Sequence, residues 1–316
     1  MTYNPLVSVV IPTFNRRAML LKAIDSVLHQ TYSPIELIIV DDGSDDGTHE
    51  ACAGRNDLTY VRMNRGKPQT ENSRLPKSFG TNGVSATRNT GIRRCADRAA
   101  PQHQAPDRRS AERRARAEFI ALLDSDDLWQ PTKIEEQIRY FEKNPEAMIC
   151  QTEEIWIRKG KRVNAKNIHK KYSGDIFNRC LPRCIVSPSA VMFKKALLEK
   201  VGMFDETFPV CEDYELWLRV ASQFPVGLLP DPLTIKRGGH ADQLSGQHSL
   251  DYYRIRALVK LLGQGRLSDA QKNAAAGELK KKRDIFLLGC RKRGNERSHR
   301  EIEALTEEFI KAAEYA

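Results

Sequence analysis

The chain has 316 residues, of which 40% are hydrophobic and 29% are charged, as is usual for a globular protein. No apolar run approaches the ~20 residues that span a bilayer, and the first residues lack the basic and apolar regions of a signal peptide. The net charge of +10 comes from two stretches, residues 93–117 and 251–316, and the rest of the chain is balanced.

Seven cysteines are spread along the chain without a Cys-x-x-Cys pair, and their number is odd. This spacing favours reduced thiols in a cytoplasmic protein over a disulfide framework or a zinc site. The two basic stretches suit a peripheral contact with anionic headgroups at the inner face of a membrane, with an acidic partner or with nucleic acid. A solvated basic surface also explains them, and we expect no specific nucleic-acid binding.

The N-terminal segment predicts a strand, a helix and a second strand. Residues 7–12 form a β-rich apolar run, and residues 36–40 form another. Between them, Leu20, Ile24 and Val27 recur at helical spacing. A βαβ unit places its two strands parallel with a right-handed crossover, so we expect both strands in a sheet that is covered by helices on each face.

Carboxylates gather where the second strand ends. Asp41, Asp42, Asp45 and Asp46 occur beside two turn-forming glycines. Carboxylates in a buried site can accept hydrogen bonds from a nucleobase or a ribose hydroxyl, which discriminates strongly between ligands. An ordinary turn explains a single Asp-Gly pair more simply, but a second acidic cluster follows a later strand.

Residues 58–62 predict a third strand, and residues 63–82 predict a loop. Residues 83–92 are expected to open a helix that brings Arg88 to the acidic edge of the sheet. There its planar guanidinium can brace carboxylates or bind a phosphate, although an ordinary surface arginine is the alternative. The Pro-, Arg- and Gln-rich residues 100–117 break the pattern and predict an insertion.

The apolar run 119–123 predicts a buried strand that ends in four polar residues, Asp124, Ser125, Asp126 and Asp127. Crowded carboxylates repel one another at short range, and a cation between them removes the repulsion. Mg²⁺ and Mn²⁺ prefer oxygen ligands and are usually held by carboxylates together with substrate phosphates. One interpretation is therefore a metal–phosphate site; the other is a solvated turn in which Asp127 caps the next helix.

The second half of the chain mixes further strands and helices. The expected elements are a helix at 131–144, strands at 147–152 and 154–158, and a turn and strand at 187–193. From residue 249 the pattern is helical to the end. Its apolar face is expected to comprise Ile302, Leu305, Phe309 and Ala312.

Two polar segments in this half are functional candidates. Glu212 and Asp213 lie in the first turn of a predicted helix, where the helix dipole favours negative charge. The same position suits a general base, because a carboxylate in a cleft can take a proton from a hydroxyl nucleophile. Residues 236–245 contain two glycines, basic residues and His240, which suits closure over phosphates, although a lone histidine is usually structural.

Five segments, in this order and spacing, resemble the family 2 glycosyltransferases, which are inverting enzymes with the type A nucleotide-sugar fold. The segments are 9–16, 40–48, 86–92, 123–127 and 204–217. The resemblance implies an α/β fold with a Rossmann-like mixed, mostly parallel central sheet, helices on both faces and a C-terminal α-helical extension. It implies a catalytic domain at 1–248, with a nucleotide-binding part to about 130 and an acceptor part after it, and a basic helical extension at 249–316.

The resemblance also implies roles for individual residues. Asp124 and Asp126 match the Asp-x-Asp motif that holds Mn²⁺ or Mg²⁺ against the diphosphate, and Asp213 matches the catalytic base. The residues expected to contact the nucleotide sugar are Pro12, Thr13, Asn15, Arg16, Asp41, Asp42, Arg88, Asp124, Ser125 and His240. The segments 65–82 and 93–117 are longer than the family's usual connection.

The expected activity is metal-dependent, inverting transfer of a sugar from a nucleoside-diphosphate sugar, with UDP as the preferred nucleotide, to a hydroxyl acceptor. The acceptor would be a glycan, a lipid-linked sugar or another hydroxyl compound, in cell-surface glycan or polysaccharide synthesis. A non-catalytic scaffold that binds a partner through the basic stretches is an alternative, but it has no use for the acidic clusters. A nucleotidyltransferase would need a Gly-rich phosphate loop after the first strand, and residues 13–16 contain no glycine.

Overall fold

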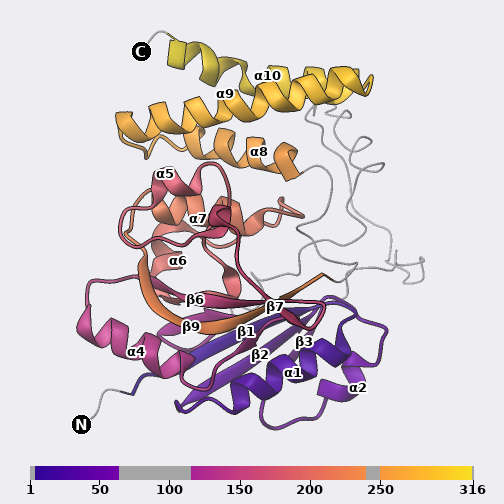
Figure 1. Ribbon diagram of the computed structural model, residues 1–316, viewed down its shortest axis with the longest axis vertical. Coiled ribbons are helices and arrows are strands. Elements are labelled where there is room, and N and C mark those ends of the chain that lie inside the picture. The colour runs from indigo at the N-terminus through magenta and orange to yellow at the C-terminus, as the bar shows by residue number, and fades with distance from the viewer. Residues whose placement is uncertain (1–3, 64–114, 240–249, 315–316) are drawn as a thin grey trace, which may run out of the picture.

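The computed structural model describes residues 4–63, 115–239 and 250–314. The predicted helix with Arg88, the predicted loop before it and His240 lie outside the described residues. Within the described residues, strands and helices alternate along the first part of the chain, and the end is helical (Figure 1).

The first half of the central sheet is parallel. Strand β1 (Val7–Thr13) pairs with β2 (Ile35–Asp41) on one side and with β4 (Phe119–Leu122) on the other, and β2 pairs with β3 (Thr59–Arg62). The sequence predicts all four strands, and the structure confirms them. Because they run in the same direction, the loops that follow β1, β2 and β4 leave at one edge of the sheet.

The second half of the sheet is mixed. Strand β8 (Val191–Lys194) pairs antiparallel with β4 and with β6 (Ile149–Arg158). Strand β6 pairs in parallel with β9 (Gly227–Gly238) and antiparallel with β7 (Lys161–Val163), and β5 (Leu128–Trp129) pairs antiparallel with β9. The order across the sheet is β3-β2-β1-β4-β8-β6-β9-β5, with β7 beside β6. The predicted mixed central sheet is therefore confirmed.

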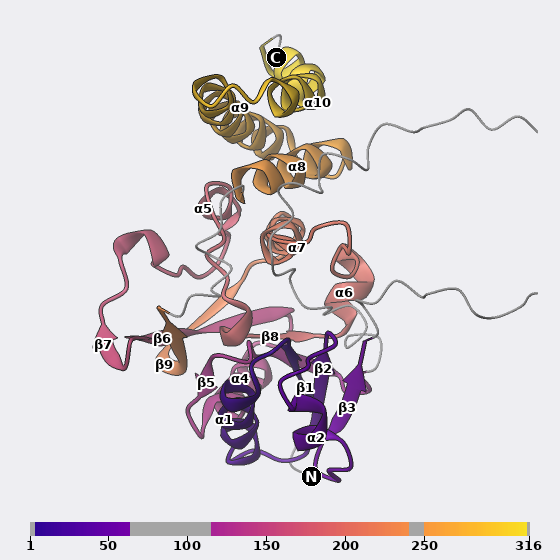
Figure 2. The ribbon, with the colours of Figure 1, turned by 90° about the vertical axis from the view of Figure 1, so that its right-hand side faces the viewer.

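Helices cover both faces of this sheet (Figure 2). Helices α1 (Arg17–Leu28) and α4 (Lys133–Lys143) contribute to the core on one face. Helices α6 (Ala196–Val201) and α7 (Glu212–Ala221) contribute to the core on the other. The remaining short elements are α2 (Thr48–Cys52), α5 (Phe177–Cys180), η2 (Asn167–His169) and η3 (Pro188–Ala190).

The strands are apolar on both faces, which is why two cores form. Along β1, the side chains of Val9 and Ile11 belong to the core that contains α1, whereas Val10 belongs to the core that contains α7. Successive side chains of a strand point to opposite faces, so a continuous apolar run fills both layers. The loops at the strand ends are thereby held between two packed layers.

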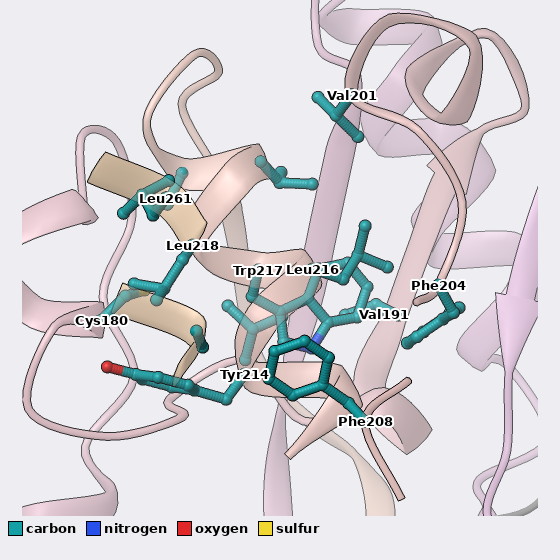
Figure 3. Packing of buried hydrophobic residues seen from close by; sticks show 14 of the residues in the cluster. Cys180, Val191, Val201, Phe204, Phe208, Tyr214, Leu216, Trp217, Leu218 and Leu261 are labelled. Atoms are coloured by element: carbon teal, nitrogen blue, oxygen red, sulfur yellow. The ribbon is translucent and has the colours of Figure 1, made fainter. Parts of the chain in front are cut away.

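Helix α7 is fixed by aromatic packing (Figure 3). The Trp217 side chain is buried, and its ring centroid lies 6.3 Å from that of Phe204. Tyr214 is also buried, and its hydroxyl donates a hydrogen bond to the carbonyl oxygen of Leu181 at 2.6 Å. Large aromatic side chains contribute much of the packing energy of a core. The first turn of α7, which carries Asp213, consequently has a rigid support.

Three helices form the C-terminal extension, as predicted: α8 (Leu250–Gly263), α9 (Asp269–Lys292) and α10 (Glu296–Glu314). They stack on the side of α7 that faces away from the sheet (Figures 1 and 2). None of the described helices combines the length and the apolar character needed to cross a bilayer. The six cysteines in the described ranges are free thiols.

The extension is joined to the rest of the chain by ion pairs and hydrogen bonds. On α8, the Lys260 ammonium lies 2.6 Å from a carboxylate oxygen of Asp205 and 2.7 Å from one of Glu215. On α9, Lys282 Nζ donates to the carbonyl oxygen of Pro182 at 2.8 Å. These contacts reach α7 and the segment before η3, and the predicted boundary at residue 248 lies outside the described residues.

Two predictions about strand and helix boundaries are wrong. The expected strands at 147–152 and 154–158 are one strand, β6, whose pairing register with β9 shifts on either side of Glu153. Such a bulge changes the alternation of side chains without ending a strand. The alternative interpretation of Asp127 as a helix cap is also wrong, because β5 follows it directly and α4 begins only at Lys133.

The predicted apolar face of the last helix is confirmed only in part. On α10, Ile302, Thr306 and Ile310 are buried, whereas Leu305 is 37% exposed. A spacing of four residues along one side of a helix explains the buried set. The sequence pattern therefore predicts the helix and part of its buried side, since Ile302 is buried and Phe309 packs against the core, but it misses Thr306 and Ile310.

Candidate functional site

A cavity of about 590 Å³ lies at the edge of the sheet where β1 and β4 end. Its lining comes from the loops after these two strands, the outer half of β6, the residues before η3, the first turn of α7, the end of β9 and the start of α8. Open α/β sheets commonly bind ligands beyond the carboxyl ends of their strands. The cavity is therefore the natural candidate for the functional site.

The loop after β4 brings three carboxylates together. Asp124, Asp126 and Asp127 each offer an oxygen within 4.8 Å of the others, and all three line the cavity. The Asp127 amide donates to the carbonyl oxygen of Asp124 at 3.0 Å, and the Asp124 amide donates to Ser189 Oγ at 3.1 Å. Grouped carboxylate oxygens are the donor set that hard divalent cations prefer, so these residues fit a Mg²⁺ or Mn²⁺ ion.

Asp127 is the buried member of this acidic cluster. It accepts hydrogen bonds from the Ser189 hydroxyl at 2.6 Å and from the Arg237 amide at 2.9 Å. Burial raises the pKa of its carboxyl group to about 7, the ammonium of Lys236 at 3.6 Å opposes the shift, and the two acidic neighbours add to it. Asp127 is thus held by protein groups, and Asp124 and Asp126, which match the Asp-x-Asp motif, are the candidate ligands.

Opposite charges alternate along the wall next to Asp127. Glu154 and Lys171 form an ion pair at 3.0 Å, and their side chains are 4% and 3% exposed. Burial by itself would raise the pKa of Glu154, but the charges of Lys171 and Lys236 hold it below its usual value. Removing one member of a buried pair typically costs about 3–5 kcal/mol, so this wall has a fixed structure.

The loop after β1 is attached to the loop after β2. Asn15 has a φ of 50°, a left-handed conformation that asparagine tolerates better than most residues. Its amide donates to Ser44 Oγ at 2.8 Å, and its side-chain oxygen accepts from the Asp45 amide at 2.9 Å. The next residue, Arg16, forms an ion pair with Asp126 at 3.1 Å. The turn therefore delivers a guanidinium group to the acidic cluster.

Six of the residues expected to contact the nucleotide sugar line the cavity: Pro12, Thr13, Asn15, Arg16, Asp124 and Ser125. Thr13 is buried, and its hydroxyl oxygen has no hydrogen-bond partner among the described residues. A buried hydroxyl without a partner is costly, so this position suits a polar group of a ligand. Arg88 and His240, which are also expected to contact the nucleotide sugar, lie outside the described ranges.

Asp41 and Asp42 are not among the lining residues. The Asp41 carboxylate is buried and accepts from the amide and the hydroxyl of Ser44, at 2.9 and 2.5 Å, and from the Tyr60 hydroxyl at 2.5 Å. Asp41 thus organises the turn after β2. The Asp42 amide donates to the carbonyl oxygen of Thr13 at 3.0 Å, which puts Asp42 directly behind a lining residue. Nucleotide contacts by the two residues stay predictions.

Asp213 lines the same cavity from the first turn of α7. Its carboxylate accepts hydrogen bonds from the Tyr214 amide at 2.6 Å and from the Cys184 thiol at 3.4 Å. Burial raises the pKa of Cys184, so the thiol keeps its proton. The residue before the helix, Cys211, has a left-handed φ of 61°, a strain that proteins tend to retain at functional sites.

Sequence reasoning missed one wall of the cavity. The side chains that line the cavity on this side are those of Glu154, Trp156, Arg158, His169 and Arg183. The alternation along β6 was a usable signal, since it marks one face of a half-exposed strand. Nothing in the local pattern indicates that this face meets the acidic cluster, because β6 reaches that place only through its pairing with β8 and β9.

The model of the family described as "Glycosyltransferase like family 2" matches residues 4–236, which is more than half of the chain. The match includes the acidic cluster, Asp213 and the β6 wall. Helix α8 lies beyond it, although Leu250 and Arg254 of this helix line the cavity.

Curated relatives agree with this family. An uncharacterized glycosyltransferase of Rickettsia typhi is 29% identical over 232 residues, which cover 71% of this chain and 62% of the relative. A UDP-Glc:alpha-D-GlcNAc-diphosphoundecaprenol beta-1,3-glucosyltransferase of Escherichia coli is 28% identical over 218 residues, which cover 68% of this chain and 69% of the relative. The match spans less than two thirds of the Rickettsia proteins, from 28% to 62% of their lengths.

Solved structures show a similar fold. S. aureus TarS 1–349 in complex with UDP-GlcNAc has a TM-score of 0.59 and 14% identity, and the alignment covers 86% of this chain and 71% of TarS. The mannosyltransferase PcManGT from Pyrobaculum calidifontis, in complex with GDP-Man and Mn²⁺, has a TM-score of 0.50 and 18% identity, covering 99% and 87%. The chain therefore has the type A glycosyltransferase fold and belongs to glycosyltransferase like family 2.

Proposed function

We propose that this chain transfers a sugar from a UDP-sugar to a hydroxyl group of an acceptor, with inversion at the anomeric carbon. The observation that carries the proposal is that Asp213 and the acidic cluster line one cavity in a chain of this family. Support for UDP comes from the Escherichia coli relative, named for UDP-Glc, and from TarS, whose structure contains UDP-GlcNAc.

Asp124 and Asp126 would hold a Mn²⁺ or Mg²⁺ ion, because both offer carboxylate oxygens to the cavity. When bound, a divalent cation stabilises the negative charge that develops on a departing diphosphate. Arg16 and Lys236 bring further positive charge to the same side of the cavity. The buried Thr13 hydroxyl offers a hydrogen bond to the nucleotide.

In this proposal Asp213 is the general base. The Cys184 thiol and the Tyr214 amide orient its carboxylate, and it takes the proton from the acceptor hydroxyl. The acceptor oxygen forms a bond to the anomeric carbon as the bond to the β-phosphate oxygen breaks, and UDP leaves with the electron pair. A positioned general base typically raises a rate about 10²–10⁴-fold. A single base without a carboxylate nucleophile corresponds to direct displacement and hence inversion.

The proposed acceptor is a sugar that is linked to a lipid through a diphosphate. Support comes from two Escherichia coli relatives whose names specify GlcNAc-diphosphoundecaprenol as the acceptor. A lipid-linked acceptor requires the enzyme to work at a membrane surface. A stripe of exposed side chains on α9, formed by Lys281, Ile285, Leu288 and Lys292, suits this contact. Ile285 and Leu288 are 67% and 53% exposed, and the two lysines flank them.

The test of the donor site is a melting-temperature measurement with nucleoside diphosphates, with and without Mn²⁺. UDP should raise the melting temperature only when Mn²⁺ is present, because a ligand that binds the folded state stabilises it by mass action. The substitution Asp126→Asn should remove this metal-dependent rise. Asp269→Asn, at an exposed residue on α9, is the matched control and should leave it unchanged. A chain that no nucleotide stabilises, or an Asp126→Asn variant that behaves as wild type, would contradict the proposal.

A further inference from the structure

The cavity has a wall, built on β6, that neither the donor site nor the base uses. Glu154, Trp156 and Arg158 alternate along β6, so their side chains share one face of the sheet, and all three line the cavity. In the parallel register between β6 and β9, Trp156 pairs with Lys236. The wall therefore begins beside the acidic cluster and extends away from it.

The middle of the wall is an aromatic surface of fixed orientation. The Trp156 and His169 rings have centroids 4.9 Å apart and an angle of 39° between their planes. The Trp156 indole donates a hydrogen bond to Glu154 at 3.1 Å, and Glu154 is held in turn by Lys171. An indole supported in this way offers an apolar face to a ligand at little entropic cost. The C–H face of a sugar ring is complementary to such a surface.

Two guanidinium groups flank this aromatic surface. Arg158 and Arg183 both line the cavity. Burial is the largest cause that lowers the pKa of His169, and the positive charges of the two arginines lower it further. Within the described part of the chain neither arginine forms an ion pair, whereas Arg16 and Arg254, which line the same cavity, each have an acidic partner. Arginines whose charge is not neutralised can bind a phosphate group through two parallel hydrogen bonds.

Arg183 also connects the wall to the candidate base. The next residue, Cys184, donates its thiol hydrogen to the Asp213 carboxylate at 3.4 Å. A group bound by Arg183 therefore lies on the side of the cavity where the acceptor hydroxyl must approach Asp213. The acidic cluster, by contrast, already has Arg16 and Lys236 close to it.

We propose that Trp156, Arg158 and Arg183 form the acceptor subsite and select an acceptor sugar that carries a phosphate or diphosphate group. The sugar ring stacks on Trp156, the two guanidiniums bind the phosphate, and a ring hydroxyl reaches Asp213. This inference rests on the proposed function and goes beyond it by assigning the charge of the acceptor to named residues. A neutral acceptor would offer neither guanidinium an anionic group to bind.

The test compares two soluble probes that share a sugar: an alkyl N-acetylglucosaminyl diphosphate and the neutral alkyl N-acetylglucosaminide. Calorimetry is done on the full chain with saturating UDP and Mn²⁺, so that the diphosphate probe does not enter the donor site. We expect the diphosphate probe to bind at least about 10-fold more tightly, as charge-assisted hydrogen bonds imply. The double variant R158A/R183A should lose this preference, and Trp156→Ala should weaken the binding of both probes.

Two further variants separate charge recognition from damage to the fold. Arg162→Ala, on the exposed neighbouring strand β7, should bind both probes as wild type does, because Arg162 does not line the cavity. R158K/R183K keeps both charges and should recover part of the preference. The inference is overturned if wild type binds the two probes equally, if it binds neither, or if the preference survives in R158A/R183A. Failure of UDP to bind with Mn²⁺ contradicts the proposed function instead.

Discussion

The carboxylate of Asp213 is oriented by neutral groups, the Cys184 thiol and the Tyr214 amide. Replacing Asp213 with asparagine keeps the size of the side chain but removes its ability to accept a proton. We expect Asp213→Asn to lower the transfer rate about 10²–10⁴-fold, the usual contribution of a general base. Metal-dependent UDP binding, measured by the melting-temperature shift, should be retained, because the acidic cluster is unchanged.

The control for this substitution is Asp231→Asn, since Asp231 is an exposed carboxylate of β9 that does not line the cavity. It should transfer sugar at the wild-type rate. An Asp213→Asn variant that keeps its rate would show that another group takes the proton. A variant that loses UDP binding as well would show a role in donor binding.

At the level of residues, the sequence predicts the acidic cluster well because its members are adjacent and follow an apolar strand. It cannot tell which carboxylate faces the ligand. Asp41 ends β2 and Asp126 follows β4 in the same sheet, but Ser44 and Tyr60 surround the first with hydrogen-bond donors, whereas the second lines the cavity. This difference depends on side chains that come from separate elements, which spacing along the chain does not reveal.

One lysine of helix α8 forms ion pairs with α7 and with the segment before it. The Lys260 ammonium lies between the carboxylates of Asp205, before α7, and Glu215, on α7 itself. Burial by itself would raise the pKa of Asp205, but hydrogen bonds from Lys260 and from the Thr207 amide lower it to about 2. Because the pKa is lower in the folded state than its usual value of 3.8, this interaction stabilises the fold above pH 4.

We expect Lys260→Met to lower the free energy of unfolding at pH 7 by about 1–3 kcal/mol, because it leaves two carboxylates without their shared cation and the site is partly solvated. The difference from wild type should shrink as the pH falls from 4 towards 2, since wild type then loses the Asp205 interaction by protonation. Urea unfolding at several pH values measures both effects. Lys272→Met, which removes an exposed ion pair on α9, should cost much less. A difference that does not depend on pH would contradict the role of Asp205.

At the level of elements, apolar runs predict the strands and helical spacing predicts the helices, and most of these elements are confirmed. The errors occur where a neighbouring element decides the outcome. The bulge in β6 arises from its pairing with β9, and α10 buries the side that packs on α8 and α9. Periodicity identifies an element and its amphipathic character, but the partner that covers each face is a property of the tertiary structure.

In the molecule as a whole, the cavity and the exposed stripe on α9 belong to different layers. The cavity lies at the edge of the sheet, and the C-terminal helices stack on the far side of α7 (Figure 2). Helix α8 joins the two, because it lines the cavity with Leu250 and Arg254 and packs next to α9. If the extension binds to a membrane surface, α8 would therefore fix the position of the cavity relative to that surface.

The stripe on α9 consists of Lys281, Ile285, Leu288 and Lys292, which are all exposed and recur at helical spacing. Apolar side chains between lysines suit the interface of an anionic bilayer. We expect the full chain to co-sediment with vesicles that contain phosphatidylglycerol more strongly than with neutral vesicles. The double variant I285S/L288S should bind about 10-fold less, because two apolar side chains no longer enter the interface.

The control is Leu28→Ser, which removes an exposed leucine from α1, at the opposite end of the molecule from α9 (Figure 1). It should co-sediment as wild type does. Raising the salt concentration should weaken binding to the anionic vesicles, since the attraction of the lysines is screened over about 10 Å at 0.1 M and less at higher salt. Equal binding to neutral and anionic vesicles, or full binding by I285S/L288S, would assign the membrane contact to another surface or to none. In either case the acceptor would have to reach Asp213 without docking of the α9 stripe.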